Sequence, residues 1–195
     1  MNSAAHQLPL FPLTAHILPG GRMKLRIFEP RYLRMVKESF EQNNGFGLCM
    51  LNPQGNVESN GHIFPVGTHV QVIDFEALND GMLGITIEGG ELFNIKSIHT
   101  EKDGLRIGEI EWQSPWQAPV CDQEHPALVA RLEEVFATYP ELDELYPEKH
   151  YDDIRWLCGR WLELLPLDPN VKQELISSQC PKKISEYICT LFECF

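Results

Sequence analysis

The hydrophobic period of this chain changes once, and the change coincides with the proline-punctuated segment SPWQAPV at residues 114–120. Before this segment, short apolar runs alternate with turn residues, which is the pattern of β-strands. After it, apolar residues recur every three or four positions, as in amphipathic helices. A chain of 195 residues is long enough for two such parts. We therefore predict two subdomains, a strand-rich one over residues 1–116 and a helical one over residues 117–195.

Turn signals divide the first subdomain into strands that follow one another in antiparallel fashion. The segment VGTHVQVIDFEAL leads into Asn-Asp-Gly at residues 79–81, a strong hairpin signal, and MLGITIE returns from it. We expect Gly89-Gly90 to break that strand, ELFNIKSI to follow, and Asp-Gly at residues 103–104 to turn into the last strand. Short strands of this kind usually curl into a barrel or a sandwich.

One helix is predicted inside this half, after Glu29-Pro30, because proline is well tolerated in a first helical turn. Its apolar face holds Tyr32, Leu33, Val36 and Phe40, and its charged face holds Arg31, Arg34, Lys37, Glu38 and Glu41. The three cations belong to a basic segment, residues 22–37, in a chain whose net charge is −12. They form either a docking surface or a solvated face in which Arg34 pairs with Glu38 and Lys37 with Glu41.

The second subdomain reads as a small bundle of helices. HPALVARLEEVFATY and YDDIRWLCGRWLELLP each place apolar residues on one face, and Asp168-Pro169 is a cap-and-start pair for NVKQELIS. An acid-rich stretch over residues 139–153 is expected to be a solvated connection. The last helix carries an apolar stripe that needs another surface to cover it: Ile184, Tyr187, Ile188, Leu191, Phe192 and Phe195.

Signatures of catalysis and metal binding are missing from the sequence. It has no phosphate-binding G-x-x-x-x-G-K-[ST] loop, no G-x-S-x-G elbow and no H-E-x-x-H helix. His62 and His69 have an odd spacing, which would point them to opposite faces of a strand. The cysteines form no C-x-x-C pair, and only Cys180, beside two lysines, has a basic environment that favours a reactive thiol. We expect no catalytic residues, no metal and no cofactor, and the cysteine pattern indicates reduced thiols in a cytoplasmic protein.

Three stretches in this order resemble the N-terminal, substrate-binding domain of Lon proteases. They are LPLFPLTAHILPGGRMKLRIFEPRY, VGTHVQVIDFEALNDGMLGITIEGGELFNI and WLELLPLDPNVKQELI, and together they span nearly the whole chain. The resemblance implies an α+β fold: a PUA-like antiparallel pseudo-β-barrel with one embedded helix, followed by a small C-terminal helical bundle. In Lon this domain engages substrate proteins, whereas separate ATPase and Ser-Lys protease modules do the chemical work. Neither module is present here, so the sequence resembles the stand-alone bacterial form.

The resemblance implies a non-catalytic module that recognises unfolded or regulated polypeptides, in a role accessory to proteolysis. The protein-binding residues that we predict are Arg31, Arg34 and Lys37. RNA binding is the alternative, since PUA-like barrels elsewhere bind RNA, but the net charge of −12 opposes it. An unrecognised hydrolase is a third hypothesis. No apolar run is long enough for a membrane span, and the sequence does not fix the oligomeric state, with which a weak dimer is compatible.

Overall fold

A computed structural model describes residues 6–117 and 125–192 of the chain. The chain divides into two compact units, Met1–Ser114 and Pro115–Phe195, which we call the strand unit and the helix unit. The division falls inside the proline-punctuated segment, where the hydrophobic period changes. Whether residues 1–116 and 117–195 are independent subdomains stays a prediction.

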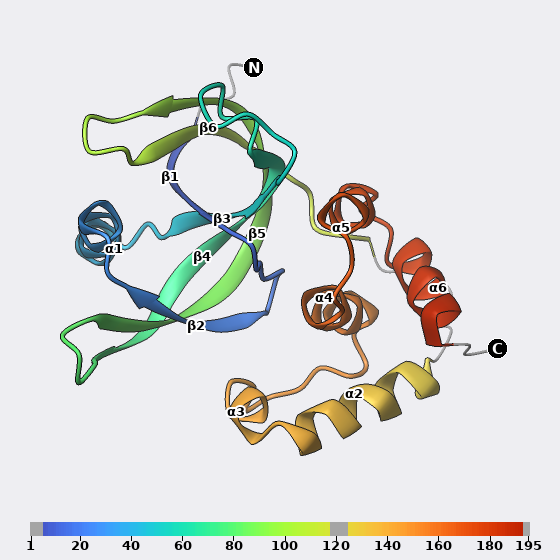
Figure 1. Cartoon of the computed structure of the whole chain (residues 1–195). Coiled ribbons are helices and arrows are strands. Elements are labelled where there is room, and N and C mark those ends of the chain that lie inside the picture. The colour runs from blue at the N-terminus through green and yellow to red at the C-terminus, as the bar shows by residue number, and fades with distance from the viewer. Residues whose placement is uncertain (1–5, 118–124, 193–195) are drawn as a thin grey trace. The chain divides into compact units, whose positions relative to one another are not determined.

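The strand unit contains, within its described residues, one helix and a mixed sheet of strands (Figure 1). The elements are β1 (His6–Leu13), β2 (Arg22–Ile27), α1 (Pro30–Gln42), β3 (Phe46–Leu51), β4 (Ile63–Ala77), β5 (Leu83–Thr100) and β6 (Arg106–Trp112). Their order in the sheet is β2-β5-β4-β3-β1-β6, and β6 also pairs with β5. The sheet therefore closes on itself into a ring. All pairings are antiparallel except that of β1 with β3, which is parallel.

The strand β5 closes the ring because it changes partner along its length. Its first part, up to Glu88, pairs with β2, and its second part, from Phe93 onward, pairs with β6. The strand runs unbroken through Gly89-Gly90, so the expectation that these glycines end it is wrong. Gly89 instead exchanges backbone hydrogen bonds of 2.8 Å with Gly20 and Gly21 in the corner before β2. A Cβ atom at Gly89 would lie 2.3 Å from the carbonyl oxygen of Leu18, so only glycine fits this close approach.

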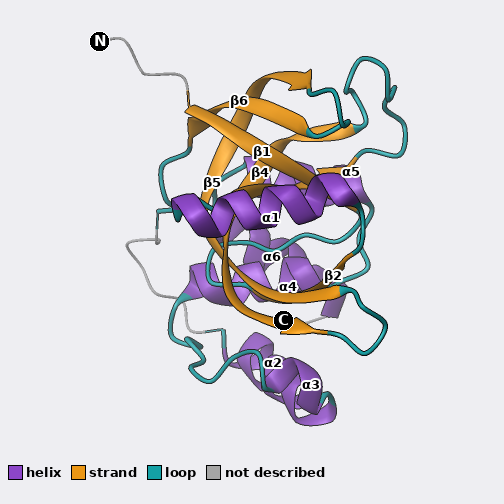
Figure 2. Ribbon diagram, turned by 90° about the vertical axis from the view of Figure 1, so that its left-hand side faces the viewer, coloured by secondary structure: helices purple, strands orange, loops and turns teal. Residues whose placement is uncertain are grey.

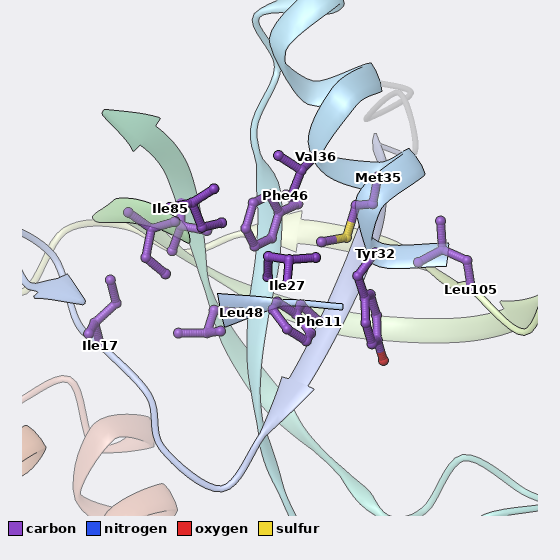
Figure 3. Packing of buried hydrophobic residues seen from close by; sticks show 12 residues of the cluster. Phe11, Ile17, Ile27, Tyr32, Met35, Val36, Phe46, Leu48, Ile85 and Leu105 are labelled. Atoms are coloured by element: carbon purple, nitrogen blue, oxygen red, sulfur yellow. The ribbon is translucent and has the colours of Figure 1, made fainter. Parts of the chain in front are cut away.

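The helix α1 crosses the strands and covers the larger apolar cluster of the unit (Figure 2). It begins at Pro30, as predicted. Tyr32, Met35 and Val36 are buried against ring side chains that include Phe11, Ile27, Phe46, Leu48 and Ile85 (Figure 3). The buried face is therefore centred on Met35. Leu33 and Phe40, expected on the same face as Tyr32 and Val36, are 38% and 45% exposed.

The helix unit is built around a buried central helix. Its described helices are α2 (Pro126–Thr138), α3 (Pro140–Asp143), α4 (Ile154–Leu164), α5 (Pro169–Ser177) and α6 (Pro181–Phe192). Asp153 and Asp168 cap α4 and α5 by accepting backbone N–H bonds of 2.9 and 2.8 Å, which confirms the predicted cap at Asp168. On α4, Arg160 is 1% exposed and pairs with Glu163 one turn along the helix.

Parts of the acid-rich stretch and of the last helix are buried in the helix unit. The stretch over residues 139–153 is not wholly solvated, because Tyr146 is 4% exposed and packs edge-on against Phe136 and Trp156. In the last helix, Ile184 and Ile188 are fully buried and Phe192 packs on Trp161. Phe195 of the predicted stripe lies outside the described residues. The α+β class, with one helix embedded among the strands and a helical bundle after them, is confirmed.

Replacing Gly89 with alanine is expected to destabilise the strand unit, and the adjacent Gly90 provides a matched control. The new methyl group of Gly89→Ala clashes with rigid backbone, which typically costs about 1–3 kcal/mol of unfolding free energy. A Cβ atom at Gly90 would lie 3.4 Å from its nearest neighbour, the carbonyl oxygen of His69, so Gly90→Ala should change stability by less than about 0.5 kcal/mol. Urea unfolding followed by tryptophan fluorescence measures both, and equal effects would contradict the role given to Gly89.

Candidate functional site

Two exposed aromatic side chains meet on the surface of the strand unit. Phe40, in the last turns of α1, and Phe75, near the end of β4, are 45% and 64% exposed. Their rings pack edge to face with centroids 5.4 Å apart. Leu33 lies two turns before Phe40 on the same side of α1, with 38% of its surface exposed. We call Phe40 and Phe75 the aromatic pair.

An irregularity in β4 explains why Phe75 projects toward α1. The register of β4 with β5 shifts between Val72 and Asp74, so that Ile73 is an extra residue in the strand. Val72 lies opposite Ile87, and Phe75 lies opposite Ile85, and both isoleucines are buried in the ring core. Residues directly opposite each other share a face of the sheet. The shift thus brings Phe75 to the α1 side, beyond the end of the covered core.

The predicted binding residues Arg31 and Arg34 are occupied by contacts within the strand unit. Arg34 pairs with Glu38 at 3.2 Å, with Asp103 at 2.8 Å and with Glu101. Arg31 donates to the carbonyl oxygen of Gly104 at 3.0 Å. These contacts tie α1 to the turn between β5 and β6.

The electrostatics of this turn agree with a fixed set of ion pairs. The pKa of Asp103 is lowered, first by the backbone N–H of Leu105 and then by the Arg34 guanidinium. The carboxylates of Glu101 and Asp103 raise the pKa of Arg34 further above its already high ordinary value. Asp103 and Arg34 therefore stay charged near neutral pH, and their interaction is lost only when acid protonates the Asp103 carboxylate.

Lys37 differs from the two arginines because it remains largely open to solvent. Its side chain is 76% exposed, and its contact with Glu41 is long, at 3.8 Å. Both predicted helix pairs, Arg34 with Glu38 and Lys37 with Glu41, are confirmed. Lys37 lies between Leu33 and Phe40 on the helix surface, three residues before Phe40. Of the three predicted residues, it is the one placed beside the aromatic pair, and the binding role of all three stays a prediction.

The basic segment is neutralised at most of its cations by pairing with carboxylates. Arg22 contacts Glu88 at 3.3 Å and Arg26 pairs with Asp80. With the pairs of Arg31, Arg34 and Lys37, most of its cations face a carboxylate. A polyanion would therefore meet alternating charges here, not a continuous positive surface.

Metal-binding and nucleophilic groups do not gather at the aromatic pair. Across residues 6–117 and 125–192, no group of three or more His, Cys, Asp and Glu side chains is arranged to hold a metal ion. Cys49 and Cys158 are buried, and burial raises the pKa of the Cys158 thiol to about 12, which keeps it protonated. Cys180 is exposed. No helix in the described part of the chain combines the length and the apolar character that crossing a membrane requires.

Comparison with known proteins finds one family model and several solved structures that match nearly the whole chain. A family model described as the ATP-dependent protease La (LON) substrate-binding domain matches residues 7–191. The crystal structure of a Lon N-terminal domain protein from Xanthomonas campestris is 29% identical, with a TM-score of 0.74, and covers 95% of this chain and 98% of its own. The N-terminal domain of the Mycobacterium avium complex Lon protease is 12% identical, with a TM-score of 0.62 and coverages of 95% and 97%, and shows the fold alone. No curated protein matches the chain.

Removing the Arg34 side chain should destabilise the strand unit more than removing that of Lys37. Arg34 joins α1 to two carboxylates far away in sequence, so Arg34→Ala is expected to cost about 1 kcal/mol of unfolding free energy. Lys37→Ala should cost less than about 0.3 kcal/mol, since it loses one long, exposed pair. Both changes introduce the same residue into the same helix, which cancels the effect of helix propensity.

The salt dependence of the two changes in unfolding free energy tests this prediction. In about 1 M salt the difference between the two variants should shrink, because exposed ion pairs are screened. Chemical unfolding with urea at low and high salt measures it. A difference that persists unchanged at high salt would show that Arg34 acts through packing and not through its charge.

Proposed function

Because the chain belongs to the ATP-dependent protease La (LON) substrate-binding domain family, we propose that it binds polypeptides and that the aromatic pair is the contact surface. The family supports a substrate-binding role. The specific occupant, an unfolded or otherwise exposed segment of another protein, follows from the chemistry of Phe40 and Phe75. Folded proteins bury their large apolar side chains, and unfolded segments present them.

The aromatic pair has the features of a binding hot spot. Aromatic side chains supply large contact areas at a low cost in conformational entropy and dominate the energy of many interfaces. Phe40 and Phe75 are held on a helix and a strand whose backbones are fixed by the core of the ring. Lys37 and Glu41 on α1 would form a polar border beside the apolar contact. The observation that carries the proposal is the meeting of two exposed phenylalanines from elements far apart in sequence.

The proposed role contains no chemical step. The substrate-binding domain of this family is non-catalytic, and we propose the same for this chain. Its contribution to proteolysis would then be to hold a polypeptide for a separate protease. Cytoplasmic location belongs to the same proposal. RNA remains the alternative partner, but the paired charges of residues 22–37 and the net charge of −12 disfavour it.

Changing Phe40 and Phe75 to serine is expected to weaken polypeptide binding at least about tenfold, which corresponds to the loss of a hot-spot contact. Fluorescence anisotropy with a labelled, permanently unfolded carboxymethylated protein measures the affinity. The matched control is Val57→Ser, because Val57 is 59% exposed but lies in the loop between β3 and β4. All variants should melt within a few degrees of the parent protein.

These binding measurements distinguish polypeptide binding at the aromatic pair from its alternatives. Unchanged affinity in the double serine variant would remove the aromatic pair as the contact surface. No binding of the unfolded protein by the parent chain, together with salt-sensitive retention of a structured RNA, would favour the RNA alternative.

A further inference from the structure

A second surface feature of the strand unit is a pocket of about 330 Å³ at the ends of β1, β2 and β3. Its apolar lining comprises Phe11, Leu13, Leu25, Ile27, Phe28 and Leu51. The volume lies at the lower end of the range for small-molecule sites, about 300–1,000 Å³. The pocket therefore suits a group the size of a single side chain, attached to a small molecule or to the end of a chain.

The polar group that distinguishes this pocket is the guanidinium of Arg106. Its Nε donates to the side-chain oxygen of Asn60 at 2.9 Å, which fixes its direction. Among residues 6–117 and 125–192, no carboxylate pairs with Arg106. Glu29 also lines the pocket, but it is held by Arg31 at 2.6 Å. Arg106 thus lines the pocket without an ion pair to any acid of the described chain.

Most arginines of the described chain pair with a carboxylate, whereas Arg106 does not. Acidic residues outnumber Lys and Arg by 28 to 16, and the other arginines that line the pocket, Arg26 and Arg31, each have a carboxylate partner. Arg106 is half-buried and shares the pocket lining with apolar side chains, where a charge without a counter-ion is costly. A planar guanidinium in such a place matches the two oxygens of an incoming carboxylate or phosphate.

Tyr32 and His62, which also line the pocket, add no negative charge, and the carboxylate among the lining residues, Glu29, is paired with Arg31. Burial raises the pKa of Tyr32, so its hydroxyl stays protonated at neutral pH. In Figure 3 this hydroxyl points away from the packed core side chains. Burial and the charge of Arg106 lower the pKa of His62, which favours its neutral form. Tyr32, His62 and Arg106 all line the pocket.

We propose that this pocket binds a carboxylate carried on an apolar body. Arg106 pairs with the carboxylate, and the aromatic and aliphatic lining covers the body. Two sources share this chemistry: the C-terminal carboxylate of a polypeptide that ends in an apolar residue, and a small free acid. Inorganic phosphate fits the guanidinium but leaves the apolar lining uncovered. The pocket shares no lining residue with the aromatic pair, so this proposal stands or falls independently of the proposed function.

Calorimetric titration of the full chain with N-acetyl-phenylalanine and with its amide tests the proposal, because the two probes differ only in the charge of the terminal group. The acid should bind saturably, and the amide at least about tenfold more weakly. Arg106→Met should lose at least about tenfold in affinity for the acid, with an intermediate loss in Arg106→Lys, which keeps the charge without the fork. Lys102→Met removes a cation from the exposed turn between β5 and β6 and should bind like the parent.

Two further probes decide whether the bound carboxylate belongs to a polypeptide C-terminus or to a small free acid. If a decapeptide that ends in phenylalanine with a free carboxylate binds more tightly than 3-phenylpropionate, the ligand is the end of a polypeptide chain. If 3-phenylpropionate binds more tightly, the ligand is a small free acid. Equal affinity for acid and amide, full affinity for the acid in Arg106→Met, or equal binding of inorganic phosphate would each overturn the proposal. If Arg106→Met does not fold, the comparison of acid with amide on the parent chain still decides.

Discussion

The close backbone contact between Gly89 and the Leu18–Gly21 corner is the constraint on which the strand unit depends. It lies where β5 leaves β2 and continues toward β6. A side chain at this point would push the corner away, and β5 could not follow both partners. With the contact in place, β5 links the two edges of the sheet, and the strands close into a ring without a long free edge.

The closed ring determines which side chains of α1 are buried and which are exposed. Met35 and Val36 are buried in the core, and Arg34 fastens the helix to the turn between β5 and β6. The position of Phe40 is therefore set before any partner arrives, and so is that of Phe75 on β4. A surface that is already ordered loses little conformational entropy on binding. This is the physical reason why a rigid ring is a suitable support for capturing flexible polypeptides.

Features of the fold that depend on neighbouring residues could be predicted from the sequence, and features that depend on distant residues could not. The hairpin turn at residues 79–81 and the helix start at Pro30 depend on neighbouring residues, and both were predicted correctly. Gly89 was misjudged because its role depends on a backbone segment about 70 residues away. Ile73 shifts the face of the strand by one residue, so periodicity alone misplaces Phe75. The pair of Arg34 with Glu38 is local and was predicted, whereas its contacts with Glu101 and Asp103 were not, because those residues are distant in sequence.

We propose that an unfolded polypeptide binds to the aromatic pair on a preformed ring. NMR titration of the isotopically labelled chain with an unfolded polypeptide tests it most directly. We expect the shift changes to concentrate in the second half of α1 and the end of β4, while the resonances of α2 to α6 stay in place. Changes confined to the helix unit, or a wholesale change across all strands that indicates a remodelled ring, would contradict it.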